Sequence, residues 1–427
     1  MRLLNELVLP SFSGSKEIRG IRSRPLRWIW HFYTVRLTTA GRWFLWPSVA
    51  FLAYTSASLD FQSFVPLSYV AGMWLIAILT AFFVRPRATL RPVHAERICA
   101  GETLMVDAEV QHNGGPAADL YVVPHRLPIE VDALPPEGVP LAPLPAGQKS
   151  HVKFGLRCMK RGVYALPGYR IETDFPFGVI TAARIVDAPR PLLVYPSFRP
   201  LTTFALPEGR RYQPGGVALA SETGDSAEYV GNREYREGDN VRDIDWRATA
   251  RLGMPVIREY RQEYFLRVAV VVDTHIPRNA PGGMAQRRES FEHAVSIAAA
   301  VGDYLARKEY IVDLFAAGPN LFHLTAGRSL AYLDQILDIL ACIGESPSEP
   351  FESIAPELMA NMGSISSIIC VFLDWNESRR QFVRMLRAQG VGVKAIIVSN
   401  AACALDPVAD GETRLTHADV AAGVEDL

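Results

Sequence analysis

The chain has 427 residues, of which 49% are hydrophobic and 21% are charged, and its 44 Lys and Arg nearly balance its 45 Asp and Glu. This length leaves room for two or three domains, and the composition excludes an intrinsically disordered chain. A net charge of -1 gives no support for nucleic-acid binding. The five cysteines lack the C-x-x-C spacing of a zinc site, which favours reduced thiols in a reducing compartment.

Residues 1–40 form a basic segment without the apolar stretch and small-residue cleavage site of a signal peptide, so we do not expect a cleaved signal peptide. Residues 43–84 follow as two uncharged runs, Trp43 to Leu59 and Phe61 to Val84, separated by Asp60 alone. Runs of this length predict a transmembrane hairpin of two helices, with a buried hairpin of a soluble protein as the alternative. Arginines flank the outer ends of both runs and are absent between them. This pattern predicts that both termini and the folded domains are cytoplasmic.

A second pattern, with apolar residues at every other position, begins after the apolar runs. It is clear from Leu104 to Val110 and from Val152 to Leu156, and Pro-rich and Gly-rich turns separate such stretches. Short alternating strands of this kind predict a β-sandwich over residues 88–195. Within it, the aromatic rings in the corner Asp174 to Gly178 are predicted to serve packing around a Pro-Gly bend.

Residues 196–263 begin as a linker rich in Pro, Gly and Ser and end in a dense block of charges. The block, Asn232 to Glu263, holds seven Arg and seven Asp or Glu but no Lys. Because guanidinium groups paired with carboxylates suit partly buried or interface positions, the block predicts either an ion-pair network or a partner-binding surface. The residues that carry this prediction are Arg233, Glu234, Tyr235, Gly238, Asp239, Arg242, Asp245, Trp246 and Arg251.

Strands and helices alternate over residues 264–400. The run Leu266 to Asp273 is rich in Val, as in a strand covered on both faces, and the amphipathic stretch Gln286 to Lys308 follows it. This alternation predicts a doubly wound α/β domain, and residues 401–427 are predicted to be an acidic, mobile tail. The remaining predicted elements are strands at Tyr310–Ala316, Leu321–Leu324, Ile368–Asp374 and Val391–Val398, and helices at Leu330–Cys342 and Glu377–Gln389.

The charged block also carries a family resemblance. From Gly231 to Arg251 the chain reads Gly-x-Arg-Glu-Tyr-x-x-Gly-Asp-x-x-Arg-x-Ile-Asp-Trp-x-x-x-Ala-Arg, which resembles the signature of the bacterial DUF58 proteins. Two further stretches match in order: Thr39-Ala40-Gly41-Arg42, and Arg161-Gly162-Val163-Tyr164 followed by the corner Asp174 to Gly178. The resemblance implies an architecture more than a chemistry.

The α/β region resembles the von Willebrand factor A fold, whose metal site uses Asp-x-Ser-x-Ser, a Thr and a further Asp. Carried over by position, Asp273 matches the first acid, Asp374 the last, and Ser329 the Thr. His275 and Pro277 replace the two serines, so the oxygen shell that Mg²⁺ prefers is incomplete. We therefore expect a degenerate site, with a bound divalent cation as the less favoured alternative to a structural pair of acids.

The chain contains no H-E-x-x-H, G-x-S-x-G or phosphate-loop motif, so no enzyme and no cofactor is predicted. The resemblance implies a non-enzymatic scaffold in the bacterial inner membrane that binds a MoxR-type AAA+ ATPase. Transglutaminase-like and other von Willebrand factor A membrane proteins are further implied partners. The alternative is an envelope-associated enzyme or metal-dependent binding protein that uses the strand-end acids.

Overall fold

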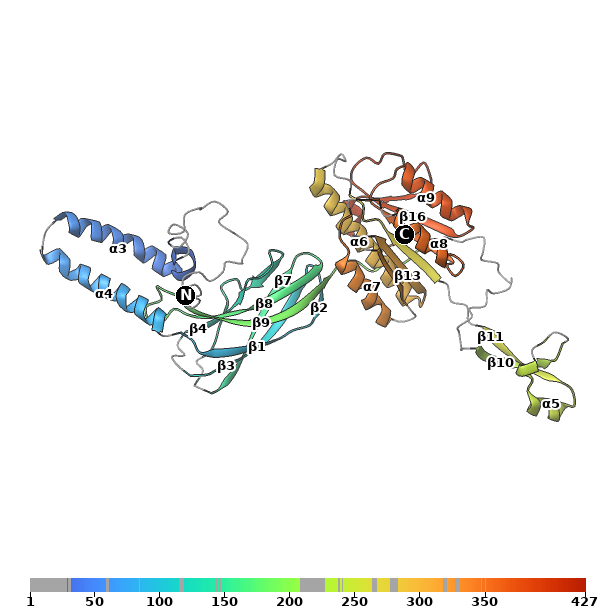
Figure 1. The fold of residues 1–427 in the computed structure, drawn as a ribbon, viewed down its shortest axis with the longest axis horizontal. Helices are drawn as coiled ribbons and strands as arrows, with labels where there is room; N and C mark the ends of the chain where they lie inside the picture. Colours follow the sequence, from blue (N-terminus) through green and yellow to red (C-terminus); the bar gives the residue numbers. More distant parts are fainter. Residues whose placement is uncertain are drawn as a thin grey trace. The chain divides into compact units, whose positions relative to one another are not determined.

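The protein is a mixed α/β chain whose described part contains several separate β-sheets (Figure 1). The computed structural model describes residues 29, 32–58, 61–83, 85–114, 119–142, 145, 147–207, 227–236, 239, 241–262, 267–276, 283–317, 321–326, 330–346, 348–349 and 351–427. The chain divides into two compact units, residues 1–197 and residues 198–427. All five cysteines are free, in agreement with the sequence prediction.

The two apolar runs of the first unit form the helices α3 (Thr39–Ser58) and α4 (Phe61–Phe83). They pack on each other through Trp74, whose ring lies 6.0 Å from that of Phe44 and whose Nε1 donates to Ser48 Oγ at 3.2 Å. Among the described helices, the stretch Phe64–Phe83 of α4 is long and apolar enough to cross a membrane, and 6% of it is buried. Of the two predicted spans, only α4 therefore meets this requirement, because α3 includes Arg42 and several Ser and Thr.

The start of α3 is fixed to the corner that joins two strands of the β-sandwich. Leu37 forms an antiparallel bridge with Ile180, and Thr38 donates its backbone N–H to Val179 O at 3.2 Å. Gly41 lies so close that a Cβ atom there would stand 2.1 Å from Val179 O. Two stretches of the family signature that are far apart in sequence, the one around Gly41 and the corner ending at Gly178, therefore meet in space.

The corner Asp174 to Gly178 and the residues after it contact the start of α3 through backbone atoms, whereas the aromatic rings of the corner are exposed. Phe175 and Phe177 are 41% and 45% exposed, so the predicted packing role of these aromatic side chains is wrong. A short π-helical turn, Phe32–Arg36, precedes α3, and Val179 and Ile180 share a small buried cluster with Leu37 and with Ala77 of α4.

The predicted β-sandwich is present as two sheets that enclose one apolar core. Its alternating positions, Val106, Val110, Phe154 and Leu156 among them, are almost completely buried. One sheet has the order β1-β3-β7-β5 and the other the order β2-β9-β8-β4-β6. The strands are β1 (Ala88–Val93), β2 (Arg97–Cys99), β3 (Thr103–His112), β4 (Leu120–His125), β5 (Val131–Leu134), β6 (Val139–Pro140), β7 (Lys149–Cys158), β8 (Gly162–Thr173) and β9 (Ala182–Tyr195).

The second unit contains a six-stranded sheet of order β14-β13-β12-β15-β16-β17, in which only the edge strand β14 runs antiparallel to its neighbour. Apolar side chains of α8 and α9 cover one face of the sheet and α6 and α7 the other. The strands are β12 (Arg267–Val272), β13 (Ile311–Ala317), β14 (Leu321–Ala326), β15 (Ser367–Phe372), β16 (Gly392–Val398) and β17 (Thr413–Leu415). The helices are α6 (Gly283–Arg307), α7 (Leu330–Cys342), α8 (Phe351–Asn361), α9 (Glu377–Ala388) and α10 (His417–Ala422).

The acidic residues 401–427 are not a loose tail. Within them β17 adds a parallel strand to the sheet, and α10 begins with a capping box between Thr416 and Asp419. Glu412, 7% exposed, forms an ion pair with Arg387 at 2.7 Å, and Asp410 accepts a hydrogen bond from Trp375 Nε1 at 2.8 Å. The prediction of a mobile tail fails because several of these acids are partners of folded elements.

Candidate functional site

The order in which strands are added to the sheet of the second unit reverses between β12 and β15. The chain leaves β12 toward β13 on one side and later returns to β15 on the other. Open α/β sheets bind ligands at such switch points, outside the carboxyl ends of the strands. Asp273 directly follows β12 and Asp374 closely follows β15, so both predicted acids lie on this rim.

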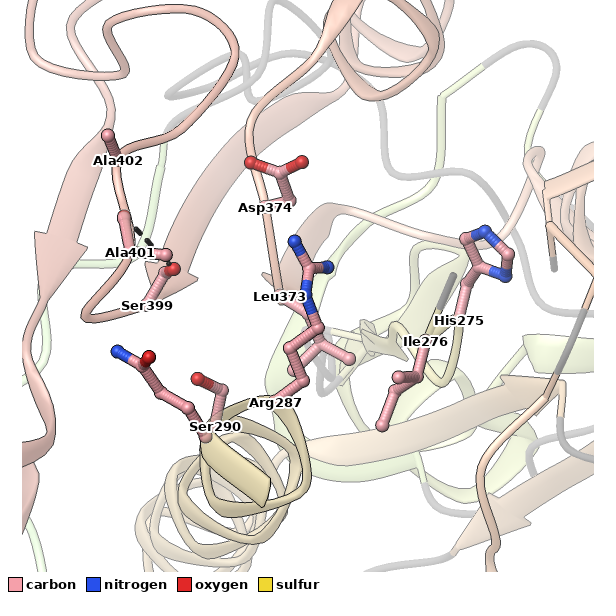
Figure 2. Close-up of a pocket in the computed structure, with 10 residues that line it drawn as sticks. His275, Ile276, Arg287, Ser290, Leu373, Asp374, Ser399, Ala401 and Ala402 are labelled. Atoms are coloured by element: carbon pink, nitrogen blue, oxygen red, sulfur yellow. Dashed lines mark hydrogen bonds between the residues drawn. The ribbon is translucent and has the colours of Figure 1, made fainter. Parts of the chain in front are cut away.

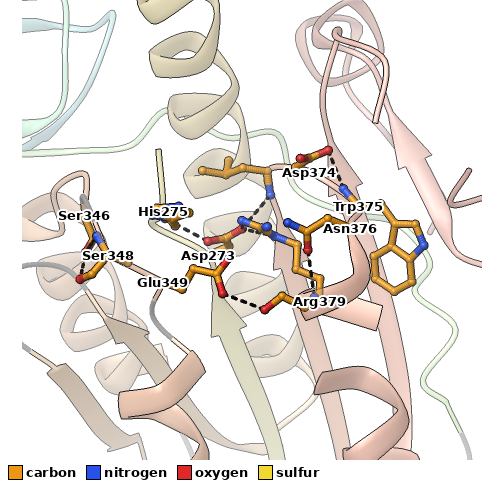
Figure 3. A network of polar contacts seen from close by, with 11 residues as sticks. Asp273, His275, Ser346, Ser348, Glu349, Asp374, Trp375, Asn376 and Arg379 are labelled. Atoms are coloured by element: carbon orange, nitrogen blue, oxygen red, sulfur yellow. Dashed lines mark hydrogen bonds and ion pairs between the residues drawn. The ribbon is translucent and has the colours of Figure 1, made fainter. Parts of the chain in front are cut away.

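A buried arginine neutralises the first of these acids. Asp273, which is 0% exposed, accepts hydrogen bonds at Oδ2 from Arg379 Nε at 2.8 Å and from Arg379 Nη2 at 2.6 Å (Figure 3). The backbone N–H groups of His275 and Leu373 also donate to the carboxylate, at 2.9 Å and 3.2 Å. Burial alone would lower the pKa of the Arg379 guanidinium, but the charge and hydrogen bonds of Asp273 outweigh it and raise that pKa.

This ion pair bears on the predicted metal set of Asp273, Ser329 and Asp374. Arg379 supplies at Asp273 the positive charge that a divalent cation would otherwise supply. The carboxyl group of Asp374 accepts a hydrogen bond from the backbone N–H of Trp375 at 2.8 Å, and Ser329 lies outside the described residues. The geometry thus favours a structural role for Asp273 over metal binding.

A small crevice that contains several polar side chains opens beside the ion pair. Figure 2 shows Arg287 and Ser290 of α6 facing Asp374 and Ser399 from the strand ends. One guanidinium, one carboxylate and two hydroxyl groups can hydrogen-bond a polar group. The hydroxyl of Ser290 is also within 2.7 Å of Nε2 of His417 on α10.

The charged block folds into a compact structure that we call the Arg/acid module, residues Ala227–Gln262. Strands β10 (Ala227–Glu234) and β11 (Val256–Gln262) pair antiparallel, and the connection between them carries the 3-10 turn η2 (Val241–Asp243) and the helix α5 (Trp246–Leu252). Gly253, with φ of 71°, ends α5 in the left-handed conformation that glycine adopts without strain.

Two of the predicted acids of the module, Asp239 and Asp245, have structural roles. Asp239 forms a bidentate ion pair with Arg233, at 2.7 Å and 2.8 Å, and accepts the backbone N–H of Arg236 at 2.8 Å. Asp245 caps the N-terminus of α5 by accepting the N–H groups of Arg247 and Ala248, at 3.1 Å and 3.0 Å. The carboxylates are therefore occupied by the module itself.

The pKa values of these acids reflect the same contacts. The hydrogen bonds from Arg233, and then that from the backbone of Arg236, lower the pKa of Asp239 from 3.8 to about 2. The backbone N–H of Ala248 is the main cause that lowers the pKa of Asp245. Two acids with depressed pKa values are ionised at neutral pH and suit ion pairing better than general acid catalysis.

Asp239→Asn is expected to loosen the turn between β10 and η2, since a neutral amide cannot accept both guanidinium hydrogen bonds. Peptides spanning Asn232 to Asp239 should exchange amide hydrogen faster at neutral pH, as measured by mass spectrometry. Because the pKa of Asp239 is lower in the folded than in the unfolded chain, its ionised carboxylate stabilises the module above about pH 4. This stabilisation is lost as the pH falls toward about 2. Asp243→Asn, in η2, is the matched control and should leave the exchange unchanged. Equal effects of both substitutions would contradict the role assigned to Asp239.

Most of the other predicted residues of the module that the structure describes are exposed to solvent. Trp246, Val241 and Leu252 are 67%, 59% and 54% exposed, which places apolar surface on η2 and α5. Among the remaining predicted residues that the structure describes, Glu234, Arg242 and Arg251 are exposed and Tyr235 is half-buried. Gly238 lies outside the described residues.

Two residues of the second unit, Arg379 and His417, were not predicted from the sequence as site residues. Arg379 lies on the buried stripe of α9 together with Phe382, Val383 and Leu386, and an arginine on an apolar helix stripe is the signal that could have revealed it. His417 follows Thr416 at the start of a capping box, a pattern that predicts a helix start inside the supposed tail.

Comparisons with known proteins agree with the family resemblance. "Uncharacterized protein YeaD" of Bacillus subtilis (strain 168) is 22% identical over 295 residues, which are 67% of this chain and 69% of the relative. A solved CARDB domain of a Pyrococcus furiosus protein, in complex with di-metal ions, covers 26% of this chain and 96% of its own at 13% identity. Its TM-score of 0.15 is too low to inform the fold. The family model described as "Protein of unknown function DUF58" matches residues 231–401, so this part of the chain, from within the Arg/acid module through β16, is similar to that family.

Proposed function

We propose that the chain is a membrane-anchored, non-enzymatic scaffold that binds a MoxR-type AAA+ ATPase through its second unit. The observation that carries this proposal is the Arg/acid module. Its acids Asp239 and Asp245 are occupied by internal contacts, whereas Trp246, like Val241 and Leu252 of the module, is exposed. Exposed Trp together with Arg is the composition that dominates binding energy at protein interfaces.

A von Willebrand factor A-like fold for the second unit is supported by the strand order and the single antiparallel edge strand. Such a domain would recognise partners here without a cation at Asp273, because Arg379 already neutralises that carboxylate. The protein would then be held to its partner by surface complementarity, and nothing in the proposal requires turnover.

Membrane attachment is supported by α4, which is apolar over Phe64–Phe83 and little buried. The proposal includes α3 as a second span, both termini in the cytoplasm and the bacterial inner membrane as the location. The arginines outside the two runs and the five free cysteines agree with this orientation. A transglutaminase-like protein or another von Willebrand factor A membrane protein is a further proposed partner.

Trp246→Ala is expected to weaken capture of a purified MoxR-type ATPase by the detergent-purified full chain at least about tenfold. The expected loss follows from removing the largest exposed apolar side chain of the module. Val408→Ala, outside the module and also 67% exposed, is the matched control and should not change capture. Capture that is absent in the wild-type protein, or equal in both variants, would contradict the proposal.

A second candidate function, an enzyme or a metal-dependent binding protein, is favoured by the position of Asp374 in the crevice. In that case Mg²⁺ should bind the wild-type chain and not Asp374→Asn, as measured by calorimetry. If the chain is instead a scaffold, Mg²⁺ bound near Asp374 should not affect ATPase capture. Asp374→Asn should then capture as much ATPase as the wild-type chain does.

A further inference from the structure

Three potential metal ligands, none of them part of the Asp273 ion pair, converge between α6 and α10. Glu289 and His293 stand one turn apart on α6, and His417 is the first residue of α10. One ligand atom of each side chain lies within 4.8 Å of the ligand atoms of the other two. The i, i+4 spacing places Glu289 and His293 on one helix face, and His417 approaches that face from the C-terminal segment.

His417 is held firmly in its position. It is 6% exposed, its backbone N–H donates to Asn400 Oδ1 at 2.8 Å, and its Nε2 lies 2.7 Å from Ser290 Oγ. When Nε2 carries the proton and donates to Ser290, Nδ1 keeps its lone pair. In that tautomer the contact with Ser290 orients the imidazole, as the second contact of a metal-binding histidine does. Nδ1 lies 3.6 Å from Glu289 Oε2.

His293, one turn after Glu289 on α6, completes the group. Its ring centroid lies 4.8 Å from that of His417, with 36° between the ring planes. Burial, and then the neighbouring His417, lowers the pKa of His293, so that its neutral form dominates at neutral pH. Neutral imidazole is the form that binds metal.

We propose that Glu289, His293 and His417 bind one divalent transition-metal ion of the Zn²⁺ class. Two imidazoles and one carboxylate favour Zn²⁺, Co²⁺ or Ni²⁺ over Mg²⁺, which prefers oxygen ligands alone. Metal–ligand distances of about 2.0–2.2 Å require ligand atoms roughly 3.3 Å apart in a tetrahedron. The carboxylate of Glu289 can approach, because its side chain is 62% exposed. Water fills the fourth position on this open side.

This site goes beyond the scaffold function, and it would fasten the C-terminal segment to the sheet domain. The metal would link α10, and with it β17, to the first half of α6. Because Ser290 contacts His417 and also lines the crevice, the ion would hold one wall of that crevice in place. The site is thus a structural metal staple with one exchangeable water.

The test uses the full-length chain, freed of metal with a chelator and titrated with Co²⁺ as a spectroscopic probe. We expect one Co²⁺ per chain, with the visible absorption of a tetrahedral ion. Affinity should fall at least about tenfold in Glu289→Gln and in His293→Gln, which keep polar side chains of similar size. Saturating Zn²⁺ should raise the Tm of the wild-type protein by about 5 °C and leave that of His293→Gln unchanged.

His151→Gln is the matched control, because His151 also pairs with a carboxylate, that of Asp107 at 3.0 Å, without a second imidazole. It should bind Co²⁺ like the wild-type protein. No stoichiometric Co²⁺ binding, or binding that survives Glu289→Gln and His293→Gln, would overturn the proposal. Circular dichroism of each metal-free variant shows whether it has folded, and capture of the ATPase tests the scaffold function independently.

Discussion

Arg379→Ala is expected to destabilise the six-stranded sheet domain by about 3–5 kcal/mol, because it leaves a buried carboxylate without its charge partner. Among the residues that the structure describes, the backbone N–H groups of His275 and Leu373 would still donate to Asp273. Hydrogen exchange of β12 and β15 measures the effect, since these central strands open only when the domain unfolds. Exchange in the β-sandwich should not change.

The neighbouring residue on α9 provides a matched control. Arg380 is partly exposed and pairs with the exposed Glu377, and solvent-accessible pairs contribute about 0–1 kcal/mol, so Arg380→Ala should have a much smaller effect. The double variant Asp273→Asn, Arg379→Met should lose less stability than the sum of its single changes. Similar losses for Arg379→Ala and Arg380→Ala would show that the buried ion pair does not hold the rim.

Gly41→Ala is expected to separate α3 from the sandwich corner at a cost of about 1–3 kcal/mol. The reason is steric, since the new methyl group would stand 2.1 Å from the backbone oxygen of Val179 and neither backbone can yield easily. The amides of Thr38 and Thr181 bond across this junction, to Val179 O and Arg36 O, and should exchange hydrogen faster.

Gly72, in the middle of α4, is the matched control because nothing lies within 4 Å of a Cβ atom built there. Alanine has the higher helix propensity, by about 1 kcal/mol, so Gly72→Ala should leave the junction intact. Unchanged exchange at Thr38 in Gly41→Ala would refute a close contact between helix and corner.

Local periodicity was sufficient to predict most of the second unit. The predicted strand at Leu266–Asp273 became β12, Arg267–Val272, and the predicted helix at Leu330–Cys342 is α7 with the same bounds. The helix α8 was missed because Pro356 interrupts its pattern. β17 was missed because three residues, Thr413–Leu415, are too few for an alternation to be seen.

Contacts between distant residues could not be predicted in this way. Arg379 is 106 positions from Asp273, and Ser290 is 127 positions from His417, so only the folded sheet brings them together. The Arg/acid module is an intermediate case. Its acids lie within a few residues of their partners, and the sequence correctly indicated an ion pair at Asp239, although it could not show that Trp246 is exposed.

The scaffold function is tested most directly by purifying the full-length chain from native membranes and quantifying the co-purified proteins by mass spectrometry. We expect a MoxR-type ATPase to be retained in stoichiometric amounts by the wild-type chain and by Val408→Ala, and to be lost with Trp246→Ala. Retention of the ATPase by Trp246→Ala, or its absence from the wild-type preparation, would contradict the scaffold function.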